Sequence, residues 1–142
     1  MSIQLDKVQP KNKAQLKQLI NYAFKHNIYD LNFIDTSEIT DMSWLFEYIS
    51  CNFDISNWDV SNVKDMTGMF YCCYDFNCDL SNWNVSNVTD MYSMFTGCEK
   101  FNCDLSDWDI SNMMHWKNMF SGCYNMTIPI WYKKLYIVKN KI

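Results

Sequence analysis

A repeat of 25 residues is the feature that most constrains the fold of this chain. It runs without a gap as CNFDISNWDVSNVKDMTGMFYCCYD from Cys51, FNCDLSNWNVSNVTDMYSMFTGCEK from Phe76 and FNCDLSDWDISNMMHWKNMFSGCYN from Phe101. A shorter copy precedes it at 31–50, and a fragment of a further copy begins at Met126. Because one such unit cannot bury its apolar face alone, neighbouring copies are expected to stack around a shared core.

The apolar residues of the copies fall into columns when the copies are aligned. Two of these columns are Ile34, Trp58, Trp83, Trp108 and Phe46, Phe70, Phe95, Phe120. We expect such columns to lie in the interior, each residue over the next. The chain is 49% hydrophobic and 17% aromatic, which is too apolar for a disordered protein and indicates one folded unit.

Spacing inside one copy changes from the strand period to the helix period. Trp83 and Val85 alternate with polar residues, which predicts a short strand with one buried face. The stretch VTDMYSMF at 88–95 has apolar spacings of three and four, which predicts a short helix; NVTD at 87–90 resembles its capping box, and Gly97 suits its end. Together these patterns predict an α/β repeat solenoid, a leucine-rich-repeat-like stack of short parallel strands and short helices.

The ends of such a stack need caps. Residues 1–30 are predicted to form an N-terminal capping helix, with Asn12 before an amphipathic stripe of Leu16, Leu19, Ile20, Ala23 and Phe24. Leucine-rich-type repeats are expected over 31–125, divided as 31–50, 51–75, 76–100 and 101–125. Residues 126–142 are expected to form a partial repeat and a C-terminal cap, as a closing strand or turn whose lysines protect the edge.

Charge is unevenly distributed along the chain. Residues 35–125 hold fourteen Asp and Glu against three Lys, a net charge of −11, and the chain contains no arginine. An acidic body without arginine disfavours nucleic-acid binding. No apolar run approaches the roughly 20 residues that span a bilayer, and the first residues do not resemble a secretion signal, so a cytoplasmic location is expected of the chain as written.

The repeat string resembles the BspA-like leucine-rich-repeat proteins of bacteria, whose units look like F-N-x-D-L-S-N-W-D-V-S-N-V-T-D-M-x-x-M-F-x-G-C. The match covers residues 31–125 almost completely. The resemblance implies a solenoid, frequently found on surface proteins or lipoproteins that contact host or neighbouring cells, and it carries no catalytic residues. It allows a cell-surface location if the chain is a fragment.

Residues that could carry chemistry are few. The seven cysteines are expected to be mainly buried free thiols, because the count is odd and five of them recur in columns. No metal site, cofactor or catalytic constellation is predicted, and the chain is expected not to be an enzyme. Two interpretations stay open for Asp54, Asp79 and Asp104: they accept hydrogen bonds in turns, or they bind a cation such as Ca²⁺.

The predicted strand face offers a candidate binding surface. Its outward polar residues are Asn57, Asp59, Ser61, Asn82, Asn84, Ser86, Asp107, Asp109 and Ser111. Repeat proteins commonly bind partners on such a face, which favours a non-enzymatic, possibly adhesin-like module for protein or glycan binding. The alternative is a structural or regulatory protein without a dedicated ligand that self-associates through its C-terminal Trp131, Tyr132 and Tyr136.

Overall fold

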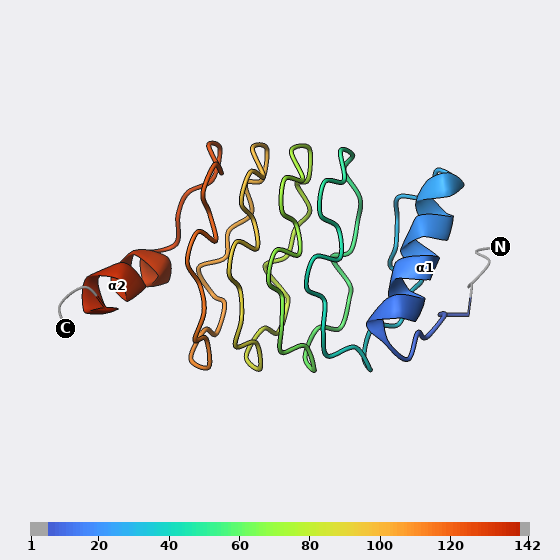
Figure 1. The fold of residues 1–142 in the computed structure, drawn as a ribbon, viewed down its shortest axis with the longest axis horizontal. Coiled ribbons are helices and arrows are strands. Elements are labelled where there is room, and N and C mark those ends of the chain that lie inside the picture. The colour runs from blue at the N-terminus through green and yellow to red at the C-terminus, as the bar shows by residue number, and fades with distance from the viewer. Residues whose placement is uncertain (1–5, 140–142) are drawn as a thin grey trace.

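The computed structural model describes residues 6–139, in which irregular coil repeats lie side by side between two helices (Figure 1). Helix α1 spans Lys13–Lys25 and helix α2 spans Ile130–Lys139. Over 6–139 no strand forms; parallel pairing is confined to isolated bridges such as Asp65 with Asp90. The predicted α/β leucine-rich-repeat-like solenoid is therefore wrong, because the repeats contain neither the short strands nor the short helices that define it.

The prediction of a strand around Trp83 and Val85 is wrong because the backbone there forms tight turns. The Trp83 N–H donates to the Leu80 carbonyl (3.1 Å), and the Val88 N–H donates to the Val85 carbonyl (3.0 Å). Between these turns, the Asn84 side chain accepts a hydrogen bond from the Ser86 N–H (3.2 Å). N–H groups that close turns within one repeat are not available for a ladder to the next repeat, so alternation of apolar side chains arises here without a strand.

The predicted helix at 88–95 fails because the backbone turns left-handed. Ser93 has φ 53° and Gly97 has φ 76°, and each is the third residue of a tight turn. A left-handed residue cannot continue a right-handed helix. The predicted capping box is also absent, because the Asn87 amide donates instead to the Ser61 carbonyl of the preceding repeat (2.7 Å).

Two consecutive tight turns, residues 66–73 in the second repeat, form a double-turn segment that joins one repeat to the next through alternate N–H groups. In the second repeat, Met66, Gly68, Phe70 and Cys72 donate to the carbonyls of Asp90, Tyr92, Met94 and Thr96 at 2.7–2.9 Å. The equivalent residues of the repeats at 31–50 and 76–100 form the same bonds with the repeat that follows each of them. The intervening N–H groups close the turns, so both ladder and turns are satisfied by one short stretch of backbone.

Two adjoining files of phenylalanine rings fill the core. Phe70, Phe95 and Phe120 stack with centroid separations of 5.3 and 5.7 Å and planes within 10° of parallel. Phe76 and Phe101 form the second file, 4.2 and 4.4 Å from Phe70 and Phe95 respectively. Burying an aromatic side chain contributes a few kcal/mol, about 2 or 3, so these files supply much of the stability of a coil without regular strands.

Indoles hydrogen-bond from one repeat to the one before it. Trp58 donates through Nε1 to the Leu31 carbonyl (2.9 Å), and Trp83 donates to Ile55 (3.2 Å). The Trp131 indole repeats this contact from α2, with the Leu105 carbonyl at 2.9 Å. A tryptophan of the C-terminal helix thus occupies the place that the next repeat would fill.

Helix α1 covers the first repeat. It begins after Asn12, whose side chain accepts the Gln15 N–H (3.0 Å), and buries Leu16, Ile20 and Ala23. The Lys17 ammonium on its inner side donates to the Leu45 carbonyl, which no preceding repeat is present to pair. Burial lowers the pKa of Lys17.

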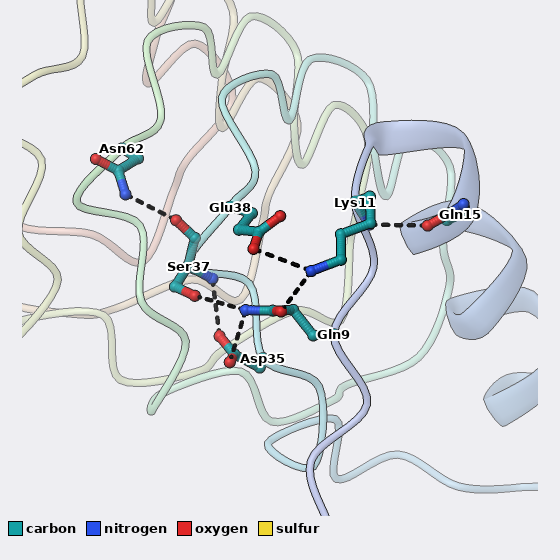
Figure 2. Close-up of polar contacts among 7 residues, drawn as sticks. All are labelled: Gln9, Lys11, Gln15, Asp35, Ser37, Glu38 and Asn62. Carbon is teal, nitrogen blue, oxygen red and sulfur yellow. Dashed lines mark hydrogen bonds and ion pairs between the residues drawn. The ribbon is translucent and has the colours of Figure 1, made fainter.

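The segment before α1 is fastened to the first repeat by polar contacts (Figure 2). Gln9 donates to an Asp35 carboxylate oxygen (3.1 Å), and the Lys11 ammonium pairs with Glu38 (3.0 Å). Val8 adds a parallel bridge to Ile34. Exposed pairs of this kind contribute at most about 1 kcal/mol each, so they fix the position of the segment more than they stabilise the fold.

The C-terminal cap differs from the expected closing strand or turn. Residues 130–139 form α2, which projects from the end of the array in Figure 1. Tyr132 packs edge-on against Phe120 (4.9 Å) and Tyr136 against Trp116 (4.5 Å), which covers the last repeat. The expected caps extend over 1–5 and 140–142 as well, and those residues lie outside the part of the chain that the structure describes.

No helix within 6–139 is long and apolar enough to span a membrane.

Candidate binding site

The polar face predicted from the sequence lies on the surface, where most of its side chains form hydrogen bonds within turns. Asp59 accepts both the N–H and the hydroxyl of Ser61, at 3.0 and 2.6 Å. Asn84 makes the same pair of contacts with Ser86, and Asp109 accepts the Ser111 N–H. The other members of the face, Asn57, Asn82 and Asp107, are exposed. This face as a binding surface stays a prediction, with six of its nine residues engaged in turns.

The side chains of the aspartate column Asp54, Asp79 and Asp104 accept hydrogen bonds in turns. Asp54 accepts the N–H and hydroxyl of Ser56 (2.9 and 2.7 Å). Asp79 accepts the same two groups of Ser81, and Asp104 accepts the N–H of Ser106 (2.9 Å). These hydrogen bonds lower the pKa of each of the three carboxyl groups. Within 6–139 no group of three or more His, Cys, Asp or Glu side chains is arranged to hold a metal ion.

An aromatic groove lies over the double-turn segments, at residues that no repeat pattern in the sequence predicts. It is an open depression of about 500 Å³. We call it the aromatic groove; its lining residues are Trp44, Tyr48, Tyr71, Tyr92, Ser93, Thr96, Asn118 and Ser121. Tyr71 stands edge-on to both Trp44 and Tyr48, with centroids 5.7 Å apart in each case. Ring faces and hydroxyl groups are therefore presented together on one surface.

The Trp44 indole lies over the backbone of the next repeat. Gly68 occupies the same column as Trp44 one repeat later and has φ 58°. A Cβ at residue 68 would lie 2.3 Å from Cε3 of the indole, so only glycine leaves room for it. The indole remains 39% exposed despite this contact, which makes it a partly open aromatic platform.

Two bulky side chains of the groove occupy backbone positions that favour glycine. Trp44 has φ 57° and Tyr48 has φ 60°, both in the left-handed region. A non-glycine residue there costs about 1–2 kcal/mol. In later repeats the two columns hold Gly68, Ser93, Asn118 and Cys72, Gly97, Gly122. Tyr48 is 65% exposed, so it gains little buried area in return for this cost.

Polar groups in the groove are open to a ligand. Within the described part of the chain, the Trp44 indole N–H and the hydroxyls of Tyr48 and Tyr92 make no hydrogen bond. None of the eight lining side chains is an acid, a lysine or a histidine. The Cys72 thiol and the Tyr48 hydroxyl raise the pKa of Tyr71, which keeps that phenol neutral. The groove is thus uncharged on a chain whose body carries excess acid.

The sequence signal for this groove lies in departures from the repeat. The apolar columns consist of residues that recur, such as the tryptophans of the core. The groove residues lie at positions that change between copies: the lining residues Tyr71, Thr96 and Ser121 share one column, in which the first copy has Glu47, a residue that does not line the groove. A search for aromatic residues where other copies have glycine would have singled out Trp44 and Tyr48.

The cysteines are free thiols, five of them buried. Cys73 donates to the Phe46 carbonyl (2.8 Å), and Cys98 and Cys123 make the same contact in the following repeats. Burial raises the pKa of Cys73 and of Cys78 to about 12 and that of Cys103 to about 11. A thiol that stays protonated is a weak nucleophile and a weak metal ligand.

The aromatic residues predicted to mediate self-association mainly pack within the chain. Tyr132 is buried and Trp131 is half-buried against the last repeat. Tyr136 is 39% exposed and shares a hydroxyl contact with Tyr132 (3.2 Å). The large apolar side chains that α2 leaves most exposed are instead Ile130, Ile137 and Val138.

These features define a protein of stacked coil repeats that carries an aromatic surface groove. A family model matches residues 14–131, well over half of the chain, and is described as Mycoplasma protein of unknown function, DUF285. The chain belongs to this DUF285 family. The resemblance to BspA-like leucine-rich-repeat proteins is therefore corrected, both by this match and by the absence of strands in 6–139. No curated protein and no solved structure matches the chain significantly.

Proposed function

We propose that this chain is a non-enzymatic binding module whose ligand occupies the aromatic groove. The observation that carries the proposal is the pair of exposed aromatic residues, Trp44 and Tyr48, held in left-handed backbone conformations. Such strain persists where another requirement outweighs it. Binding is that requirement here, because exposed Trp and Tyr side chains supply large contact area with little loss of side-chain freedom.

Binding is favoured over catalysis by the state of the reactive side chains. Burial of the Cys73 and Cys78 thiols raises their pKa to about 12, which disfavours the thiolate that a nucleophilic enzyme needs. In the candidate face, the hydroxyls of Ser61 and Ser86 donate to Asp59 and Asn84 in their own turns. Neither hydroxyl donates to a histidine, the base that most often activates a serine nucleophile.

Comparison of variants on arrays tests this proposal. Wild-type protein and the Trp44→Ala and Tyr48→Ala variants are applied to an array that carries both glycans and peptides. Tyr124→Ala is the matched control, because Tyr124 is 81% exposed and does not line the groove. We expect at least one ligand whose signal falls in both groove variants and persists in the control. Absence of any ligand, or binding indifferent to both substitutions, would contradict the proposal.

The polar face predicted from the sequence is compared in the same experiment. The combined Asp59→Lys and Asp109→Lys substitutions reverse charge there without touching the aromatic groove. The groove proposal predicts that this variant binds as the wild type does. If this variant folds but no longer binds, the ligand binds the polar face and not the aromatic groove.

Self-association is the second candidate function. Helix α2 exposes Ile137 (56%) and Val138 (63%) to solvent, and apolar groups so placed favour contact with a second copy. Sedimentation velocity over a range of concentrations tests it. A concentration-dependent dimer that disappears in Ile137→Lys would support this function, and a monomer throughout would exclude it.

A further inference from the structure

We infer that the ligand of the aromatic groove is an uncharged saccharide. This inference rests on the proposed function and specifies the chemistry of its ligand. Six of the eight lining residues carry a hydroxyl group, namely Tyr48, Tyr71, Tyr92, Ser93, Thr96 and Ser121. A hydroxyl both donates and accepts, so a surface rich in them complements a ligand that is itself polyhydroxylated.

The aromatic rings supply the apolar half of such recognition. Trp44 and Tyr92 are 39% and 42% exposed, so part of each ring faces solvent. The C–H face of a sugar ring packs on an aromatic face, while the hydroxyls at its edge reach polar neighbours. Asn118 and Ser121 are exposed in the same groove as those rings and can serve as such neighbours.

Charge favours an uncharged ligand over a charged one. The groove is lined by no acid and no base, whereas residues 35–125 carry fourteen acidic residues against three lysines. A sulfated or phosphorylated ligand would meet repulsion from this surrounding charge and find no cation within the groove. A cationic ligand would find no carboxylate among the lining residues.

The backbone of the groove disfavours a peptide that binds by strand addition. The N–H groups of Trp44, Tyr48 and Gly68 donate to the next repeat at 2.8, 2.8 and 2.9 Å. A peptide added as a strand needs a free edge of N–H and C=O groups. Recognition in this groove therefore depends on side chains, and these offer ring faces and hydroxyls.

Arrays that separate ligand classes test the inference. The full chain is applied to neutral oligosaccharides of glucose, galactose, mannose and N-acetylglucosamine, to sialylated and sulfated glycans, and to proline-rich and random peptides. The strongest soluble hit is then titrated calorimetrically against wild type, Trp44→Ala, Tyr48→Ala and the Tyr124→Ala control. We expect a neutral saccharide, with affinity lowered about tenfold or more in the groove variants only.

The other outcomes contradict either the saccharide inference alone or the binding proposal as well. If only peptides bind, and Trp44→Ala abolishes that binding, the saccharide inference fails and the binding function stands. Preference for sulfated or sialylated glycans would likewise overturn the inference alone. If no binding depends on Trp44 or Tyr48, both proposals fail. Circular dichroism of each variant shows that it is folded, and Tyr48→Ala, whose side chain is largely exposed, keeps the test decisive if Trp44→Ala does not fold.

Discussion

The Trp108 indole N–H donates to the carbonyl oxygen of Leu80, one repeat earlier, at 3.0 Å. The same carbonyl accepts the backbone N–H of Trp83, so one oxygen closes a turn and joins two repeats. This arrangement recurs at Leu31 and Ile55. The tryptophan side chain thus replaces a strand ladder on the side of the array where tight turns prevent one.

Removal of that indole N–H should weaken the fold by a modest amount. Trp108→Phe keeps an aromatic ring in the core and deletes the bond to Leu80, so we expect the free energy of unfolding to fall by about 1–2 kcal/mol. Trp44→Phe is the matched control, because its indole N–H has no partner within 6–139, and it should change stability by less than about 0.5 kcal/mol. Urea unfolding measures both; equal effects would contradict the structural role of the interior indoles.

The phenylalanine files should carry a large share of stability. Phe95 contacts Phe70, Phe101 and Phe120 with centroids 4.4–5.7 Å away. Phe95→Ala leaves a cavity among them and should destabilise the protein by about 3–5 kcal/mol. Phe95→Leu retains most of the volume and should cost less than about 1.5 kcal/mol. Similar losses for the two variants in chemical denaturation would argue against a close-packed ring stack.

Gly68 should be required both by the backbone and by Trp44. Gly68→Ala places a methyl group at a left-handed position and in the space of the indole, so we expect a loss of about 1–2 kcal/mol and a displaced Trp44. Gly97→Ala imposes the same backbone cost (φ 76°) without meeting Trp44. Acrylamide quenching should therefore rise for Gly68→Ala and stay unchanged for Gly97→Ala. Unchanged quenching in both would show that Trp44 does not lie over Gly68.

The buried thiols should resist modification and make the fold sensitive to alkali. At pH 8 we expect Ellman's reagent to modify rapidly at most the half-buried Cys51 and Cys72, and all seven cysteines after denaturation. Unfolded thiols ionise near pH 9, whereas burial raises the pKa of Cys73 and Cys123 to about 12. Below pH 9 the buried thiols make their full contribution to the free energy of unfolding. This contribution is lost as the pH rises toward 12, by at most about 1.4 kcal/mol per pH unit for each thiol.

A flat stability profile between pH 8 and 10.5, or rapid native modification of more than two thiols, would contradict this prediction. Chemical denaturation at each pH supplies the profile. Cys98→Ala is a useful comparison, because burial raises the pKa of Cys98 as well and its removal should reduce the slope.

Tyr48 should be dispensable for folding. Tyr48→Gly relieves a left-handed conformation but adds freedom to the unfolded chain, and these effects nearly cancel, so stability should change by less than about 1 kcal/mol. Binding at the groove should nevertheless fall. A large destabilisation on thermal or urea unfolding would indicate that Tyr48 serves packing, which its 65% exposure argues against.

The repeat period and the apolar columns were predictable from the sequence, because equivalent positions such as Phe70 and Phe95 meet the same environment. The local conformation was not. Trp83 and Val85 alternate as in a strand, but the turns between Leu80 and Val88 produce the same alternation. A helical spacing at 88–95 likewise conceals the left-handed residue Ser93, since serine gives no signal as clear as glycine.

The candidate site was even less accessible to sequence reasoning. The predicted residues Asp59 and Asp109 do lie on the surface, but their side chains shape turns. The groove depends on residues from different repeats, such as Trp44 and Tyr92, that no shared motif connects. Its signature is the break in the repeat at Trp44, where the next copy has Gly68.

The central claim is that the Trp44 indole contacts the ligand, whereas the buried indoles of Trp58, Trp83 and Trp108 stabilise the stack of repeats. A ¹H–¹⁵N spectrum resolves the indole signals during titration with the neutral saccharide that binds best. The account predicts that the Trp44 signal shifts progressively while those of Trp58, Trp83 and Trp108 stay in place. A bound saccharide that leaves the Trp44 signal unmoved would contradict the account.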